Sequence, residues 1–232
     1  MGKLRLEITK GEEIRYISHL DYASAIERAV IRSKMPAAYS EGFNPHMKLS
    51  FASALAVGVT SQAEYMDIEF KEDMDLKQAI QRLAAVLPPG IKINSGKYVP
   101  ANAPALMALV NLATYDVVVP VGKVEDTTAF EESIRRFNQT EEVLYIRETP
   151  KGRKEIEVKQ YMDQDIKLIP QEEGIKLVID SKITPTGSIK PGEILDILVT
   201  MFNLAVDKDK ALINRTGLYV VTNGKRLKPI DL

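Results

Sequence analysis

Hydrophobic and polar residues alternate along several short stretches of this chain and recur at helical spacing in others. Residues 3–9, KLRLEIT, place apolar side chains at every second position, which is the pattern of a half-buried strand. Residues 17–33 change to helical spacing, and Ser18 with Asp21 resembles a capping box at the helix start. The beginning of the chain therefore predicts a strand followed by a helix.

The two periods continue to alternate along the next part of the chain. Residues 49–57 and 64–70 read as two paired strands, with the turn expected near 58–62. Residues 75–87 carry one apolar stripe at helical spacing and stop at two prolines and a glycine, after which residues 91–99 extend again. The predicted order of this half is β-α-β-β-α-β.

The second half repeats the helix-strand order with an extra strand or hairpin in its middle. Residues 99–111 contain two prolines and little charge, so the internal boundary is expected there, although ALMALV also fits a short packed helix. Strands are predicted over 115–120, 142–148, 154–161, 174–180 and 212–221, and helices over 127–138 and 191–203.

These elements predict an α+β fold made of two tandem ferredoxin-like (βαββαβ) halves, with antiparallel sheets and helices packed on one face. The expected N-terminal half is 1–110, and the expected C-terminal half is 111–232. This fold carries many functions, so the function has to come from the residues of a site.

Composition excludes several classes of protein. Lys and Arg number 31 against 32 Asp and Glu, so a basic binding site has to be a local patch. The chain has no cysteine, which excludes disulfides, thiolate zinc sites and an iron-sulfur cluster of its own. We expect no cofactor, no secretory signal at the N-terminus, no membrane partner and a cytoplasmic location.

The segment RYISHLD, Arg15 to Asp21, begins the first predicted helix. If the helix starts near Ser18, then Arg15, Tyr16 and His19 lie at its N-terminal end. Free backbone N–H groups and the helix dipole favour an anion at this position. We therefore take these three side chains as candidate ligands of a phosphate.

The loop YSEGFNPHMKLSF, residues 39–51, follows that helix. Gly42 allows positive φ, and Pro45 restricts Asn44 and prevents a helix, so the backbone is expected to hold one shape. The aromatic side chains offer stacking faces, and the histidine and lysine offer donors to a phosphate or a base edge. The candidate binding residues of the loop are Tyr39, Ser40, Gly42, Phe43, Asn44, His46 and Lys48.

Each of these residues also fits a structural role in a turn or at the edge of a core. His19 and His46 are the only histidines, and the chain has no cysteine. Two imidazoles alone are too few ligands for a transition-metal site, so no metal is expected. A histidine can still carry a proton in catalysis near neutral pH. An RNA-processing reaction that needs no metal and uses His46 or His19 stays an alternative.

Two basic stretches in the second half are further candidates. The turn KGRK, residues 151–154, brings Arg153 and Lys154 together, and NRTGLY places Arg215 shortly before Tyr219. A basic turn attracts phosphate, and it is equally the pattern of an ordinary solvated turn. We add Arg153, Lys154 and Arg215 to the candidate binding residues.

The motifs RYISHLD, YSEGFNPHMKLSFASALAVG and EYMDIEF resemble the bacterial radical SAM-linked protein family, in which this domain is fused to a radical S-adenosylmethionine (SAM) protein or encoded beside one. The resemblance is strongest over residues 13–70 and extends to KEIEVKQY, GSIKPGEIL and NRTGLYV. Met47 stands where members of that family commonly carry proline. The residues that carry the resemblance are Arg15, His19, Asp21, Ser40, Gly42, Phe43, Asn44, Pro45, His46 and Lys48.

This resemblance implies an accessory protein with a radical SAM partner. A radical SAM enzyme holds its cluster with three cysteines, and this chain has none, so the chain is not expected to be the catalyst. The leading hypothesis is a module that binds transfer or ribosomal RNA for modification by the partner. A similarity to CRISPR repeat-processing endoribonucleases is at the level of the fold and favours the RNA-processing alternative. A protein-protein adaptor for the radical SAM partner is the third hypothesis.

Overall fold

The computed structural model describes residues 2–123, 126–150 and 152–232. The chain forms two compact units. The first comprises the residues up to Asn111 together with Gly217–Leu232, and the second comprises Leu112–Thr216. The division after Asn111 falls beside the expected boundary, whereas the residues from Gly217 onward belong with the first unit and not with the expected C-terminal half.

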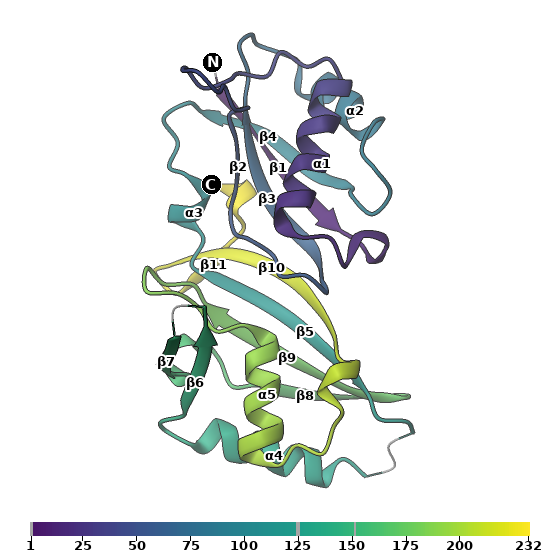
Figure 1. Cartoon of the computed structure of the whole chain (residues 1–232), viewed down its shortest axis with the longest axis vertical. Helices are drawn as coiled ribbons and strands as arrows, with labels where there is room; N and C mark the ends of the chain where they lie inside the picture. The colour runs from purple at the N-terminus through teal and green to yellow at the C-terminus, as the bar shows by residue number, and fades with distance from the viewer. Residues whose placement is uncertain (1, 124–125, 151) are drawn as a thin grey trace. The chain divides into compact units, whose positions relative to one another are not determined.

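The first unit contains a sheet in which β1 lies between β4 and β3, and β2 pairs with β3 (Figure 1). All of these pairs are antiparallel. Its elements in chain order are β1 (Gly2–Lys10), the 3-10 helix η1 (Glu12–Ile14), α1 (His19–Arg32), β2 (Leu49–Phe51), β3 (Val59–Glu69), α2 (Leu76–Ala84), β4 (Ile93–Pro100), α3 (Leu106–Leu109), β11 (Lys225–Leu227) and η4 (Pro229–Asp231). The order β1-α1-β2-β3-α2-β4 is the one predicted from the apolar pattern.

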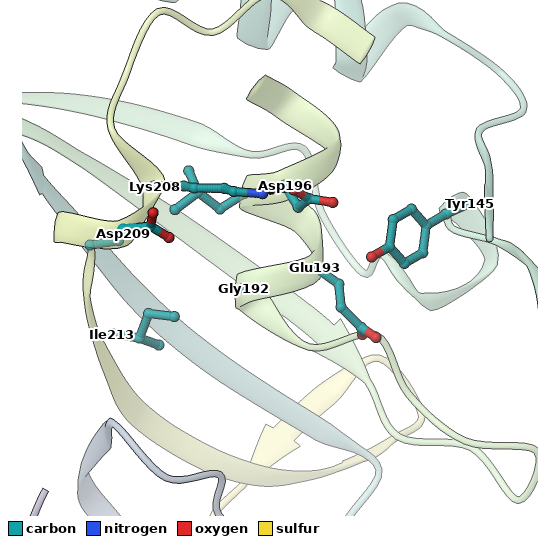
Figure 2. A pocket seen from close by; sticks show the side chains of 9 residues that line it. Tyr145, Gly192, Glu193, Asp196, Lys208, Asp209 and Ile213 are labelled. Atoms are coloured by element: carbon teal, nitrogen blue, oxygen red, sulfur yellow. Dashed lines mark hydrogen bonds and ion pairs between the residues drawn. The ribbon is translucent and has the colours of Figure 1, made fainter. Parts of the chain in front are cut away.

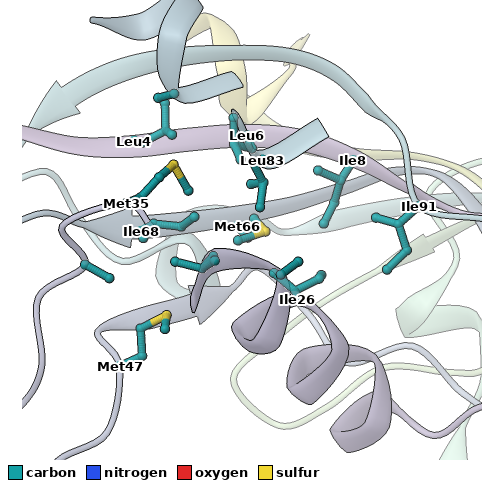
Figure 3. Packing of buried hydrophobic residues seen from close by; sticks show 14 of the residues in the cluster. Leu4, Leu6, Ile8, Ile26, Met35, Met47, Met66, Ile68, Leu83 and Ile91 are labelled. Carbon is teal, nitrogen blue, oxygen red and sulfur yellow. The ribbon is translucent and has the colours of Figure 1, made fainter. Parts of the chain in front are cut away.

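One face of this sheet and the two longer helices enclose the core of the first unit. Leu4, Leu6 and Ile8 of β1 belong to one buried cluster with residues of α1 and α2, among them Ile26 and Leu83 (Figure 3). Each of these side chains contributes about 1.5–3 kcal/mol by leaving water. The alternation that predicted β1 is thus the alternation between this core and the opposite face of the sheet.

The opposite face carries charged side chains and is covered by the segment that contains η4. Arg5 forms a buried ion pair with Asp67 and also donates to the carbonyl of Pro229 at 3.1 Å. Glu7 lies 3.5 Å from Lys228, and Lys97 donates to the carbonyl oxygen of the last residue. This face is therefore occupied by the protein's own chain over Arg5 and Glu7.

The helix α1 begins where the sequence predicted. The Ser18 hydroxyl accepts a hydrogen bond from the Asp21 backbone N–H at 3.1 Å and donates to the Asp21 carboxylate at 2.6 Å. The strand expected over 49–57 forms only as the short β2, because the chain turns at Ala56–Val59 and β3 starts at Val59. The turn therefore precedes the predicted one.

The second unit has a sheet in which β9 pairs with β5 and β8, all antiparallel. Its elements are β5 (Leu112–Pro120), α4 (Thr128–Gln139), β6 (Leu144–Thr149), β7 (Gly152–Glu157), η2 (Lys159–Tyr161), β8 (Lys167–Gln171), β9 (Gly174–Lys182), α5 (Pro191–Phe202), η3 (Lys208–Lys210) and β10 (Leu212–Thr222). The last strand continues from this unit into the first at Gly217. Its first part lies beside β5, where Thr114 and Thr216 share a hydrogen bond of 2.8 Å.

Two features of the second unit differ from the predicted elements. The strand expected over 154–161 ends at Glu157 and continues as η2, and β8 was not predicted. The strands β6 and β7 form a hairpin of their own.

The helix α5 begins at Pro191 as predicted, and Phe202 near its end packs edge-on against Phe137 of α4 with ring centres 5.3 Å apart. The fold is mixed α+β and largely antiparallel.

Candidate functional site

Arg15 lies inside the first unit. Its Nε and Nη2 donate to the two carboxylate oxygens of Glu12 at 2.8 and 2.6 Å, and its Nη1 donates to the carbonyl of Gly58 at 2.9 Å. The hydrogen bonds with Glu12 raise the pKa of Arg15 and lower that of Glu12. The carbonyl of Arg15 in turn accepts from the N–H of Gly58 and from Lys10 Nζ, both at 3.0 Å. These contacts give Arg15 a role in fixing the chain around Gly58.

The rest of the helix-start motif is partly exposed. Tyr16 is exposed, and the His19 ring meets Phe51 edge-on with ring centres 5.1 Å apart. Because Asp21 places its own carboxylate in the first turn, α1 already carries the negative charge that the helix dipole favours. A phosphate at this end would therefore meet the charge of Asp21.

The loop after α1 is closed by hydrogen bonds at its base. Ser40 N–H donates to the carbonyl of His46 at 2.8 Å, and the N–H of His46 donates to the Ser40 hydroxyl at 3.0 Å. Gly42 has φ of 122°, a conformation that side chains rarely adopt. The tip, which includes Phe43 and Asn44, is exposed, so the loop presents an aromatic ring to solvent on a defined backbone.

The loop is anchored on the end of β3. Lys48 N–H donates to Ala38 carbonyl at 2.8 Å, and Glu69 N–H donates to Lys48 carbonyl at 3.0 Å. Met47, next to Lys48, is buried in the core of the first unit. A buried side chain at this position ties the loop to the core by packing.

Cationic side chains surround the loop. The Lys71 ammonium lies 5.8 Å from the centre of the Tyr39 ring, and the Lys48 ammonium lies 3.4 Å from the Glu69 carboxylate. His46 is exposed. The loop therefore brings exposed aromatic faces next to two lysines, one of which is paired with Glu69.

Arg15 of the helix-start motif and Lys48 of the loop lie at opposite ends of β3, whereas His19 of the motif contacts Phe51, the last residue of the loop. Arg15 is bonded to Gly58 just before the strand, and Lys48 is bonded to Glu69 at its end. An extended strand rises about 3.3 Å per residue, so the two ends of this 11-residue strand are roughly 30 Å apart. Arg15 and Lys48 are therefore not brought into one site, and the loop is the better defined of the two candidates.

The basic candidates of the second unit have different environments. Arg153 is exposed and pairs with Glu148 across the β6–β7 hairpin at 2.8 Å, and Lys154 is exposed beside it. Lys151 of the same predicted turn lies outside the described residues. Arg215 is buried, donates to the Tyr115 hydroxyl at 3.2 and 3.1 Å, and lies over the Tyr115 ring. Its position in the interior was not foreseen from the sequence.

The second unit also contains a pocket of about 360 Å³ that the sequence did not indicate (Figure 2). Two of its carboxylates are engaged within the chain, since Glu193 pairs with Arg147 at 2.6 Å and Asp196 pairs with Lys208. Burial and the Asp196 carboxylate raise the pKa of the Tyr145 hydroxyl. The pocket lining is Tyr145, Gly192, Glu193, Leu195, Asp196, Lys208, Asp209, Ala211 and Ile213.

Within residues 2–123, 126–150 and 152–232 no group of three or more His, Cys, Asp or Glu side chains is arranged to hold a metal ion. Over the same residues, every helix is too short or too polar to cross a membrane.

The chain matches the family described as "Uncharacterized protein conserved in bacteria (DUF2344)" over residues 3–191, and it belongs to that family. The matched range includes both the helix-start motif and the Tyr39–Phe51 loop. A comparison with curated proteins gave no match. The family description names no activity, so the function has to come from the geometry of the loop.

Proposed function

We propose that this protein is an accessory RNA-binding module that holds a transfer or ribosomal RNA for modification by a radical SAM partner. The observation that carries the proposal is Phe43, a fully exposed aromatic ring at the tip of a loop whose base is closed by the hydrogen bonds between Ser40 and His46. Stacking an RNA base on such a ring contributes about 1–3 kcal/mol per base. The closed backbone reduces the ordering cost of binding.

The charges around the loop support RNA as the ligand. Lys48 and Lys71 flank the aromatic residues, while the chain as a whole is nearly neutral. Two lysines beside exposed rings fit a phosphate backbone with unpaired bases, which is how most sequence-specific RNA recognition occurs. The ligand proposed for this loop is therefore single-stranded RNA or an RNA loop.

We further propose that both units have the ferredoxin-like fold. In the first unit the strand order β4-β1-β3-β2 supports this, and in the second the corresponding order is β10-β5-β9-β8. Proteins with this fold often bind RNA on the open sheet face, but in the first unit Arg5 and Glu7 on that face are covered by the protein's own chain. The loop is therefore the proposed binding surface.

The radical SAM partner rests on the resemblance of residues 13–70 to the radical SAM-linked family. The absence of cysteine from the sequence supports a division of labour, because the iron-sulfur cluster has to be held by another protein. In this division the present chain binds the RNA and the partner carries out the radical chemistry.

The proposal is tested by a fluorescence titration of the protein with total transfer RNA and with a ribosomal RNA fragment, each at low and physiological salt. We expect salt-sensitive binding that weakens about tenfold in Phe43→Ala, since one stacked base is lost. Lys48→Glu should weaken binding and reduce the salt slope by about 0.7 or more, because a phosphate contact releases counterions. Ile31→Ala, which removes an exposed apolar side chain of α1, is the matched control and should leave binding unchanged.

Other outcomes would assign the loop differently. If neither RNA binds, and Phe43→Ala instead breaks a complex with the radical SAM partner, the loop is a protein-docking surface and the RNA proposal falls. If the protein alone cleaves the RNA and His46→Ala abolishes the cleavage, the protein is a nuclease. We expect the RNA to be recovered intact.

A further inference from the structure

A small pocket lies beside the base of the loop in the first unit. It has a volume of about 140 Å³ and is lined by Lys3, Lys48, Leu49, Ser50, Asp67 and Glu69. Pockets for drug-sized ligands measure about 300–1,000 Å³, so this one accepts a group of a few heavy atoms and excludes a whole nucleoside. The side chains come from three adjacent segments, which are β1, residues 48–50 at the junction of the loop and β2, and the end of β3.

The two acidic side chains of the pocket are in different states. Asp67 is fully engaged, because both of its carboxylate oxygens accept hydrogen bonds from buried Arg5 at 2.8 and 2.9 Å. Glu69 is shared between two ammonium groups, at 4.0 Å from Lys3 and 3.4 Å from Lys48. The Glu69 and Lys48 side chains are 38% and 47% exposed, so water competes for these contacts and they are weak.

Both lysines have contacts besides those with the Glu69 carboxylate. The Lys3 ammonium also donates to the carbonyl of Ala103 at 3.3 Å, and only 17% of its side chain is exposed. The backbone of Lys48 is bonded to Ala38 and Glu69. Lys3 is therefore already oriented when an anion enters the pocket. Ser50 adds a hydroxyl group to the same lining.

We infer that this pocket is a phosphate subsite for the bound RNA and that Glu69 is a built-in competitor that occupies it in the free protein. A phosphate placed between Lys3 and Lys48 would replace the Glu69 carboxylate. It would offer the two ammonium groups more oxygen acceptors than the carboxylate does. With Asp67 neutralised by Arg5, release of Glu69 leaves the two ammonium groups as the dominant charge of the pocket.

The subsite deepens the proposed function and rests on it. Lys48 belongs to the same loop as Phe43, only five residues along the chain. In this proposal one RNA strand stacks a base on the Phe43 ring and places one of its phosphates near Lys48. Because Glu69 has to be displaced, weakly charged ligands are rejected and a phosphate is selected.

The test compares Glu69→Gln with the wild-type protein in a titration with a fluorescein-labelled single-stranded RNA at two salt concentrations. Removing the competing charge should tighten binding about three- to tenfold and steepen the salt slope by about 0.7, as for one added phosphate contact. The matched control is Glu72→Gln, which removes an exposed carboxylate outside the pocket and should change binding by less than about twofold. An affinity in Glu69→Gln equal to the control, with binding still dependent on Phe43, overturns the subsite and leaves the RNA proposal standing.

A second measurement separates the subsite from the proposed function. Inorganic phosphate is titrated into the wild-type protein in the absence of RNA, and the NMR amide signals of Lys48, Ser50 and Glu69 are followed. Saturable shifts that are lost in Lys3→Gln support the subsite even if no RNA binds, in which case only the RNA proposal fails. No shift in wild type or in Glu69→Gln overturns the subsite.

Discussion

The Arg5 guanidinium and the Asp67 carboxylate form a two-pronged ion pair, with hydrogen bonds of 2.8 and 2.9 Å between their polar atoms. Their side chains are 2% and 3% exposed. The pair joins β1 to β3 on the sheet face opposite the core, and Arg5 extends it to the carbonyl of Pro229. One charge pair thus links two strands to the segment that covers this face.

Removing one partner of the Arg5–Asp67 pair should lower the free energy of unfolding more than replacing both partners by apolar residues. Asp67→Ala leaves Arg5 as an uncompensated buried charge, and we expect a loss of about 3–5 kcal/mol in the free energy of unfolding. The double change Arg5→Met with Asp67→Leu should cost less than Asp67→Ala alone, because no buried charge is left unpaired. Urea denaturation of the three proteins measures this, and a double variant less stable than the single one would contradict the prediction.

Arg15 gives a contrast between buried and exposed arginines. Arg15→Ala removes the bonds to Glu12 and Gly58, and we expect a loss of about 1–3 kcal/mol in the free energy of unfolding. Arg153→Ala removes an ion pair whose side chains are 77% and 71% exposed, and should cost less than about 0.5 kcal/mol. Equal losses in the two variants would mean that Arg15 does not fix the chain at Gly58. Thermal unfolding monitored by circular dichroism distinguishes the two outcomes.

The pattern of apolar residues predicted the strongly periodic elements and missed the long-range contacts. The strand β1 and the helix α1 were found because their side chains alternate between one core and its surroundings, whereas β8 was missed because KLIPQ is short and mostly exposed. The loop at Gly42 was recognised from local turn chemistry.

The environments of the charged candidates were not predictable from residue type. Arginine is usually exposed, so Arg15 and Arg215 were expected to be available to a ligand. The structure buries both, through partners 43 and 100 residues away in the chain, Gly58 and Tyr115. Such partners have no signature in the local sequence. The same applies to the pocket between Lys3 and Lys48, whose two lysines are far apart in the sequence and meet only through strand pairing.

Two buried tyrosines of the first unit should respond differently to loss of the hydroxyl. The Tyr22 hydroxyl donates to the carbonyl of Thr9 at 2.8 Å, whereas the buried Tyr65 hydroxyl has no hydrogen-bond partner among the described residues. Tyr22→Phe should therefore cost about 0.5–1.5 kcal/mol of unfolding free energy at pH 7. Tyr65→Phe should be neutral or stabilising, because it removes an unsatisfied buried group. A loss of stability in Tyr65→Phe similar to that in Tyr22→Phe would contradict this assignment.

The same tyrosines predict a loss of stability at alkaline pH. Burial raises the pKa of Tyr22 and of Tyr65 above the ordinary value of 10.0, and the Glu7 carboxylate adds to the effect at Tyr65. Above pH 10 the unfolded chain releases a phenolic proton that the folded protein retains, so the free energy of unfolding falls as pH rises toward the folded pKa. Urea denaturation between pH 8 and 11 should show a shallower decline in Tyr65→Phe than in wild type. Parallel declines would show that Tyr65 titrates normally.

Gly42 tests whether the shape of the loop matters for binding. Its φ of 122° is strained for any side chain, while a Cβ at this position meets no atom within 4 Å, so Gly42→Ala acts through the backbone alone. The strain of about 1–3 kcal/mol should be relieved by a change in loop conformation, which reorients Phe43 and lowers RNA affinity by about tenfold. Gly122→Ala is the matched control, because Gly122 also has positive φ and open space around its Cβ position, but belongs to the second unit. If both variants bind RNA as the wild type does, stacking on Phe43 does not depend on the loop conformation. If only Gly42→Ala weakens binding, the loop contributes to affinity through its restrained backbone as well as through its side chains.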